Sequence, residues 1–186
     1  MSSKKVISMV LSFWFGEQSS PNYGEQKSFW FQSTPEWDRK IQHQFEIVYH
    51  DAMLGKLDDL SETPEGALAL ILILDQFPRN MYRGTPLAFA SDQKALEIAK
   101  NGLIKKFDQS LMPVERSFFY LPFEHSENLG DQEKSVMLYQ TLGDKEYLEY
   151  AKEHHDVIAR FGRFPHRNAI LGRTSSQDEI NYLAVH

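Results

Sequence analysis

Apolar side chains recur at intervals of three and four residues along several stretches of the chain, which is the spacing of one face of an α-helix. Two of these stripes are long. The first lies in residues 35–55 and consists of Trp37, Ile41, Phe45, Val48 and Ala52. The second lies in residues 145–161 and consists of Tyr147, Ala151, His154, Ile158 and Phe161. Each stripe predicts an amphipathic helix that packs one face against a core.

One stretch is apolar on every side. Residues 67–74 are apolar without a gap, but the run is far shorter than the roughly 20 residues that a membrane-spanning helix needs. A helix that is apolar all round lies at the centre of a bundle. Asp75 and Gln76 follow directly, and a proline inside a helix removes a backbone hydrogen bond. We therefore expect Asp75 and Gln76 to leave the core just before Pro78 breaks the helix.

Three threonine–proline pairs mark helix starts, because threonine can cap the free amides of a first turn and proline is favoured at the first helical position. These pairs are Thr34-Pro35, Thr63-Pro64 and Thr85-Pro86. Further helices are expected over residues 5–15, 86–102, 113–120 and 131–142 and, after a capping box of Ser175 with Asp178, at the C-terminal end. The pattern predicts an all-α fold, a single-domain bundle of about eight helices over residues 1–186.

The composition of the chain excludes several classes of protein and of functional site. A chain of 186 residues with 41% hydrophobic content can bury one sizeable core. The absence of cysteine excludes disulfides, thiol catalysis and thiolate metal sites, and it makes a reducing, cytoplasmic location the simplest expectation. The net charge of −6 argues against a general nucleic-acid binder. Ser8 and Ser12 interrupt the apolar N-terminal run, so we interpret it as a first helix, neither a signal peptide nor a membrane anchor.

Residues 160–173 concentrate arginine beside aromatic side chains. The polar members are Arg160, Arg163, His166, Arg167, Asn168 and Arg173, and the aromatic ones are Phe161 and Phe164. Arginine presents a planar fork of donors that pairs with carboxylate or phosphate, and it tolerates partial burial better than lysine. Pro165 forces a break in the preceding helix. An arginine cluster at a helix break, bordered by aromatic rings, predicts a polar pocket for an anion.

Residues 75–85 repeat part of this pattern, since they also contain Phe-Pro shortly before Arg-Asn, here Arg79 and Asn80. Together with Leu-Pro-Phe-Glu-His-Ser-Glu at residues 121–127, these segments resemble the bacterial DUF924 family. The resemblance runs from Val10 to the last helix. It implies an all-helical, tetratricopeptide-like fold, and it brings no established activity, so function must be argued from the residues.

The residues after the apolar run have a structural explanation as well as a functional one. Asp75, Arg79 and Asn80 follow the driest helix of the chain. The helix dipole alone favours a cation at a helix C-terminus by about 0.3–1 kcal/mol, so Arg79 could be purely structural. We give the two explanations equal weight.

A second polar group surrounds Glu124 and His125. With Glu115 and Glu127 nearby, these residues could form a hard metal site or a general acid–base pair. We favour the alternative that the acids neutralise the arginines of residues 160–173. No spacing typical of a metal site supports the first possibility, and no cofactor motif is present, so we expect neither a metal nor a cofactor.

Two histidines complete the candidates. His154 falls on the apolar stripe of its helix, where a lone histidine is more often a satisfied core group than a catalyst. Its position shortly before the arginine-rich residues 160–173 favours a functional role. His166 follows Pro165 and can sit in the first turn of a short helix, where free amides favour an anion.

Three hypotheses follow. The favoured one is a binding module for a small anionic ligand or short peptide, in which a carboxylate or phosphate meets Arg79, Asn80, Arg163, Arg167 and Asn168, with Arg160 and His125 beside them. The second is a hydrolase or lyase, with His154 or His166 as acid or base, oriented by Asp75 or Glu124, and the arginines holding the substrate's charge. The third is a helical interaction scaffold whose polar segments are architectural. None of the three involves nucleic acid or membrane.

Overall fold

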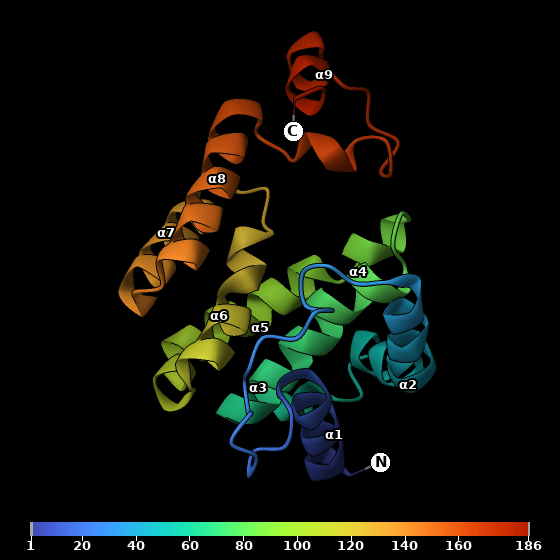
Figure 1. Cartoon of the computed structure of the whole chain (residues 1–186), viewed down its shortest axis with the longest axis vertical. Coiled ribbons are helices and arrows are strands. Elements are labelled where there is room, and N and C mark those ends of the chain that lie inside the picture. The colour runs from blue at the N-terminus through green and yellow to red at the C-terminus, as the bar shows by residue number, and fades with distance from the viewer. Residues whose placement is uncertain (1, 186) are drawn as a thin grey trace.

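The computed structural model describes residues 2–185, and all regular structure in that range is helical (Figure 1). The α-helices are α1 (Ser3–Phe15), α2 (Pro35–Met53), α3 (Pro64–Ile71), α4 (Phe77–Met81), α5 (Asp92–Ile104), α6 (Pro113–Glu124), α7 (Leu129–Leu142), α8 (Lys145–Phe161) and α9 (Gln177–Leu183). The shorter elements are the π-helix η2 (Leu72–Gln76) and the 3₁₀-helices η1 (Asp58–Glu62), η3 (Pro86–Phe89), η4 (Phe107–Ser110) and η5 (Pro165–Arg167). The all-α prediction is confirmed. Across the described range, no helix combines the length and apolarity that crossing a bilayer requires.

The apolar run forms the centre of the molecule, as predicted, but the helix does not stop where we expected. α3, η2 and α4 follow one another without a break from Pro64 to Met81, and residues 66–78 are all buried. The carbonyl of Leu74 loses its usual partner because Pro78 has no N–H, and it accepts a hydrogen bond from the Ser91 hydroxyl instead. A π-turn adds one residue to the helical repeat. The expectation that Asp75 leaves the core is therefore wrong, since that residue is fully buried.

Aromatic packing fills the space between this central path and the helices around it. The stripe predicted in α2 faces inward, with Ile41, Phe45 and Ala52 fully buried. Phe45 lies 4.4 Å from Phe77, centroid to centroid. Trp14 of α1 meets Phe118 of α6 edge-on at 5.5 Å. Such ring pairs add stability beyond the area they bury, so α1, α2 and α6 are fixed against one core.

Three further expectations about helix ends differ from the structure. Pro122 lies inside α6, which continues to Glu124 because well-packed neighbours hold the turn. Thr85 caps no helix, since its hydroxyl donates to the carbonyl of Tyr82, and the chain forms the short η3 before α5 begins. The capping box of α9 is formed by Ser176 with Glu179, one residue later than predicted.

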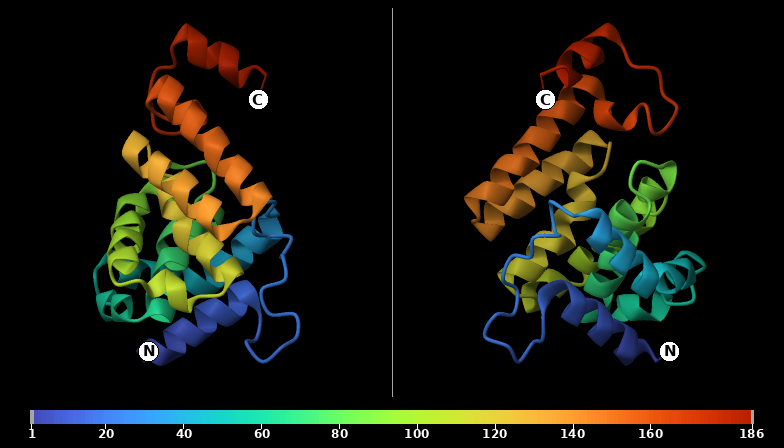
Figure 2. Two further views of the ribbon diagram at one scale, coloured as in Figure 1. Left: turned by 90° about the vertical axis from the view of Figure 1, so that its left-hand side faces the viewer. Right: turned by 45° about the vertical axis from the view of Figure 1, so that its right-hand side comes forward.

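The chain after α8 forms a separate cap at one end of the molecule, with the N-terminus at the other end (Figure 2). Two ion pairs hold it. Arg163 binds Glu179 of α9 through Nε at 2.6 Å. Arg173 binds Glu127, which precedes α7, through Nη1 at 2.7 Å. In this C-terminal segment, residues 162–185, the short helix η5 contains Arg167. The Arg167 side chain contacts the end of α6 through the carbonyl of His125.

Gly102 of α5 lies so close to α6 that the addition of one methyl group there should destabilise the protein. A Cβ added at Gly102 would lie 2.5 Å from Cζ of the buried Phe119 ring. We expect Gly102→Ala to lower the free energy of unfolding by about 1–3 kcal/mol, since an overpacked core must shift rotamers or backbone. Asn101→Ala, at an exposed position one residue away, is the control and should change stability by no more than about 0.5 kcal/mol. Equal urea midpoints for the two variants would contradict this packing.

Candidate functional site

The π-turn of the central helical path places Asp75 inside the protein. Its carboxylate lies 2.9 Å from Nδ1 of His125 and 3.3 Å from Nη1 of Arg79, and it accepts a further hydrogen bond from Gln76. Burial alone would raise the pKa of Asp75. The charge of Arg79, together with His125, outweighs burial and lowers the pKa to about 2. The site is therefore built around a buried, ionised carboxylate.

Arg79 is committed to two acids. Its Nη1 and Nη2 each donate to one carboxylate oxygen of Asp92 at 2.9 Å, and Nη1 also reaches the backbone carbonyl of Asp75. Asp92 begins α5, and burial together with the negative charge of Asp75 raises its pKa. The sequence pattern did not single out Asp92. Its only sequence signal is that of an acid in the first turn of a helix.

Arg167 is the buried arginine of residues 160–173 that has no carboxylate of its own within hydrogen-bonding distance. The carbon at the centre of its guanidinium lies 4.6 Å from the Phe89 ring centroid and 4.5 Å from that of Phe164, and its side chain is only 8% exposed. Nη2 donates to the carbonyl of His125 at 3.1 Å, whereas Nη1 is 3.5 Å from a carboxylate oxygen of Asp92. Nε is buried and has no hydrogen-bond partner among residues 2–185. Burial and the nearby charge of Arg79 lower the pKa of Arg167 to about 10.

The remaining arginines are mostly paired within the fold. Arg163 binds both oxygens of Glu179 and the carbonyl of Thr174, and Arg173 binds both oxygens of Glu127 and the carbonyl of Phe164. The Nε of Arg173 is the one further buried guanidinium nitrogen without a partner in the described range. Arg160 is exposed and lies over the ring of Phe161.

Glu124 and His154 form a second acid–histidine pair beside the first. Glu124 is 5% exposed, its Oε1 lies 3.5 Å from Nδ1 of His154, and its Oε2 is without a partner in the described chain. Burial and the negative charge of Asp75 raise the pKa of Glu124 to about 8. Burial lowers the pKa of His154. Both groups are therefore predominantly neutral near pH 7.

The hydrogen bonds determine which ring nitrogen carries the proton in each histidine. Nδ1 of His154 lies 2.8 Å from the carbonyl of Tyr150, and a carbonyl only accepts, so Nδ1 donates there. Nδ1 of His125 donates to the carboxylate of Asp75 in the same way. Burial and the charge of Arg79 lower the pKa of His125. In the neutral forms, the lone pair of each ring is therefore on Nε2.

The other predicted residues lie around this cluster or away from it. His166 is exposed, with its ring 5.5 Å from that of Phe164. Asn168 is buried, donates to Ser175 and leaves its own Oδ1 unpartnered in the described structure. Asn80 turns instead toward α2, where it donates to Asp38 at 2.9 Å. The predicted set thus divides into a central group (Asp75, Arg79, Glu124, His125, His154, His166, Arg167, Asn168) and an outlying one (Asn80, Arg160, Arg163).

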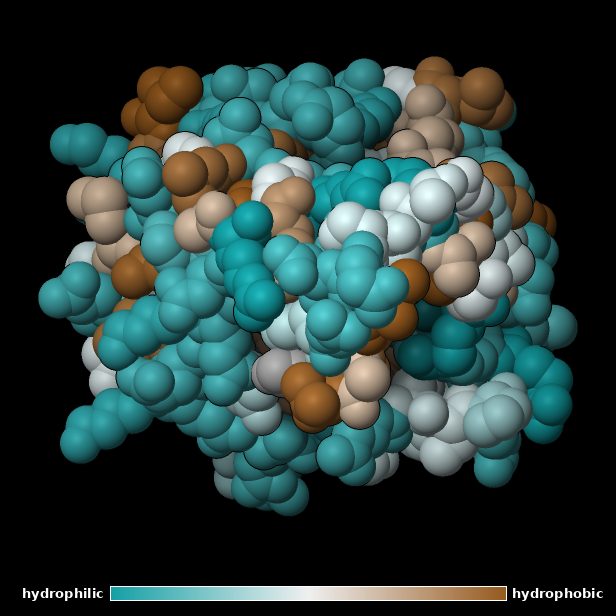
Figure 3. All heavy atoms as spheres, turned by 90° about the horizontal axis from the view of Figure 1, so that it is seen from above, coloured by the Kyte–Doolittle hydropathy of each residue, from teal (hydrophilic) through white to brown (hydrophobic). Residues whose placement is uncertain are grey.

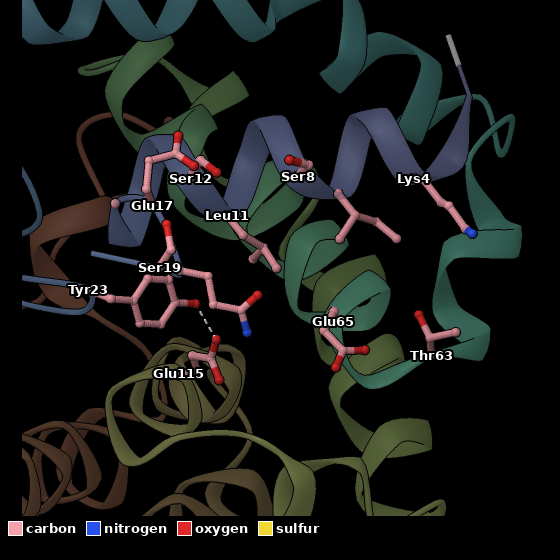
Figure 4. Close-up of a pocket in the computed structure, with 13 residues that line it drawn as sticks. Lys4, Ser8, Leu11, Ser12, Glu17, Ser19, Tyr23, Thr63, Glu65 and Glu115 are labelled. Atoms are coloured by element: carbon pink, nitrogen blue, oxygen red, sulfur yellow. Dashed lines mark hydrogen bonds between the residues drawn. The ribbon is translucent and has the colours of Figure 1, made fainter. Parts of the chain in front are cut away.

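Two hollows of the surface lie elsewhere. One, of about 770 Å³, lies beside α1 and is bordered by Tyr23, Glu65 and Glu115 (Figure 4). Glu115 accepts hydrogen bonds there from Tyr23 at 2.5 Å and from the backbone of Met112. A second, of about 440 Å³, lies near Trp30 and Tyr147. Neither contains a residue of the central group.

Solvent reaches the central group through its partly exposed members. The exposed side-chain fractions are 20% for Arg79, 15% for His125 and 32% for His154. Figure 3 shows the molecule from above, with a surface that is largely hydrophilic and apolar side chains in small groups. Within residues 2–185, histidines and acids nowhere gather in threes in a geometry that could hold a metal ion.

Comparison with known proteins places the chain in a family. The family model described as "Bacterial protein of unknown function (DUF924)" matches residues 10–186. The structure of a protein of unknown function from Agrobacterium tumefaciens is similar over 100% of both chains, with 36% sequence identity and a TM-score of 0.90. A search of curated proteins finds no match. The chain therefore belongs to the DUF924 family of bacterial proteins of unknown function.

Proposed function

We propose that this protein binds a small anionic molecule, a carboxylate or a phosphate, at Arg167. The observation that carries the proposal is a guanidinium that is almost wholly buried yet short of partners. Taking such a group out of water costs several kcal/mol unless other groups replace the lost water. An anionic ligand would supply that replacement.

A purely architectural role accounts for the other arginines better than for Arg167. Arg163 and Arg173 each form a complete two-point pair with a glutamate. Arg167 has Asp92 as its nearest acid, and both oxygens of Asp92 already accept short bonds from Arg79. Arg163 and Arg173 therefore each have a carboxylate of their own, whereas Arg167 shares its nearest acid with Arg79.

The aromatic contacts restrict how a ligand could approach. Phe89 and Phe164 pack on the guanidinium of Arg167, which leaves the edge that carries its N–H donors for polar contact. A planar carboxylate or a phosphate can accept two parallel hydrogen bonds from such an edge. The unpartnered amide oxygen of Asn168 offers an acceptor for a hydroxyl or N–H of the same ligand.

The proposal predicts that anions stabilise the protein through Arg167. At a ligand concentration 100 times its dissociation constant, the wild type should gain about 2.7 kcal/mol relative to Arg167→Met, which corresponds to roughly 5–10 °C in melting temperature. Acetate, malonate and sulfate are suitable probes in thermal melts at matched ionic strength. Arg167→Met removes one of the two guanidiniums that face Asp75 and Asp92, so its melting temperature without anion is the baseline from which its own anion response is measured.

Arg160→Met is the matched control, since it removes the same charge from an exposed position of the same segment. It should respond to anions as the wild type does. Sulfate also stabilises proteins through its exclusion from their surface, and the Arg167→Met variant experiences that effect equally. An identical anion response in all three proteins would refute binding at Arg167.

One observation favours a second function, catalysis on an anionic substrate by a hydrolase or lyase. Asp75 holds Nδ1 of His125, while Nε2 of that ring has no partner among the described residues, which is the arrangement of an oriented general base. Glu124 beside it, with a pKa of about 8, is protonated at neutral pH and could serve as a general acid. Strongly shifted pairs of this kind are more frequent at functional sites than elsewhere.

The protonated state of Glu124 can be tested through stability. A carboxyl whose pKa rises from 4.5 unfolded to about 8 folded binds its proton more tightly in the native state, so stability falls as the pH rises from 4.5 to 8. The maximum loss is about 5 kcal/mol. Glu124→Gln mimics the neutral acid, so its unfolding free energy should overtake that of the wild type between pH 5 and pH 8. Urea titrations that give parallel pH profiles for the two proteins would show that Glu124 is ionised.

A further inference from the structure

The charges of the central group already balance without a ligand. Two ionised carboxylates, Asp75 and Asp92, face two guanidiniums, Arg79 and Arg167. Their neighbours Glu124 and His125 are neutral near pH 7 on the grounds given above. An anion that binds at Arg167 therefore brings at least one negative charge that no group of the resting site compensates. Burial of an uncompensated charge is unfavourable, so a compensating positive charge must arrive with it.

Two histidines are placed to supply that charge. The rings of His154 and His166 each lie 5.5 Å from Phe164, the ring that packs on the Arg167 guanidinium at 4.5 Å. His154 extends from α8 and His166 from η5, so the two approach Phe164 from different elements. Nε2 of His154 forms no hydrogen bond within residues 2–185 and can accept a proton without breaking the bond from Nδ1 to Tyr150.

On the basis of the proposed function, we propose that an anion binds at Arg167 together with one proton, which the His154–His166 pair takes up. One negative charge of the ligand is then compensated, and its affinity rises as the pH falls. The pair accepts one proton rather than two because the charges of the two rings repel each other.

The charged groups around the pair explain why it is neutral at rest. His154 faces Glu124 of α6, Arg79 of α4 and, from η5, Arg167 and His166. Burial lowers the pKa of His154, and any charge on His166, together with the charges of Arg167 and Arg79, acts in the same direction. Neutralising the field of Arg167 with an anion removes a large part of that repulsion.

His166 has a similar environment. It faces Glu127, which favours its charged form, and Arg167, Arg173 and Arg79, which oppose it. The ring remains exposed at the surface, but the neighbours that displace part of its water are the largest cause of its lowered pKa. An anion on Arg167 acts on this ring in the same sense as on His154.

We assign the proton to the His154–His166 pair rather than to the other titratable groups of the site. Glu124 already carries its proton near pH 7. Burial lowers the pKa of His125, and the charge of Arg79 acts in the same direction, whereas Asp75 opposes both. His155, on the other side of α8 beside Asp156, has no contact with the Arg167 cluster in the described structure and provides a matched control.

Isothermal titration of the full chain with sulfate tests the proposal, because sulfate itself does not titrate between pH 6 and 8. Titrations in two buffers of different ionisation enthalpy give the number of protons taken up. We expect close to one proton near pH 7 and an affinity that falls by up to tenfold for each unit of pH increase. The double variant His154→Gln/His166→Gln should bind sulfate more weakly, with no proton uptake and no pH dependence, whereas His155→Gln should behave as the wild type.

The outcomes separate this inference from the proposed function. Sulfate binding without proton uptake, or uptake that persists in the double variant, overturns the inference and leaves binding at Arg167 intact. No sulfate binding, or binding that Arg167→Met does not weaken (an adventitious ion only), overturns both. Circular dichroism of each variant confirms that the fold is retained.

Discussion

The structure depends on a carboxylate placed where water cannot reach it. Asp75 lies on the most buried helical path of the protein and stays ionised only because Arg79 and His125 approach it. Arg79 pairs in turn with Asp92, and Asp92 attracts Arg167. The backbone carbonyl of His125 accepts a hydrogen bond from Arg167 as well. Apart from Arg79, which follows Asp75 on the same helical path, the partners come from different parts of the chain. The need to compensate one buried charge therefore joins the central helix, α5, α6 and the C-terminal segment.

Arg167 is the last residue in this series of charge pairs, and its Nε–H group has no hydrogen-bond partner among the described residues. Buried polar groups in native proteins are nearly always paired, and an exception that is also sandwiched between two aromatic rings suggests selection for something other than stability. Glu124, which lies beside His154, also leaves a buried oxygen unpartnered in the described structure. Buried donors and acceptors that lack hydrogen-bond partners among the described residues are the features of a preformed ligand-binding site.

Periodicity was sufficient to predict the helices and the central position of residues 67–74, because both follow from the alternation of apolar and polar faces. The burial of Asp75 was not predictable in this way. A pattern treats the first polar residue after an apolar run as the return to the surface, and the π-turn that carries it inward has no sequence signature. Asp92 and Phe89 were missed for a related reason, since both become important only through tertiary contacts.

For the arginines of residues 160–173, the sequence likewise did not predict the tertiary contacts. Composition indicated that Arg163, Arg167 and Arg173 would need partners, but not which of them would find one. Glu179 takes Arg163 because the capping box of α9 turns that acid inward, and Glu127 takes Arg173 because it precedes α7 at the right place. Geometry alone distinguishes Arg163 and Arg173, which each have a carboxylate of their own, from Arg167, which shares Asp92 with Arg79.

The most direct measurement is a crystal structure of the protein soaked in selenate, whose selenium can be located by anomalous scattering. The account predicts a selenium peak within hydrogen-bonding reach of the Arg167 guanidinium edge, with Asp75, Arg79 and Asp92 unmoved. Selenium peaks only at exposed cations such as Arg160, with Arg167 fully bonded to protein or buried water, would contradict it.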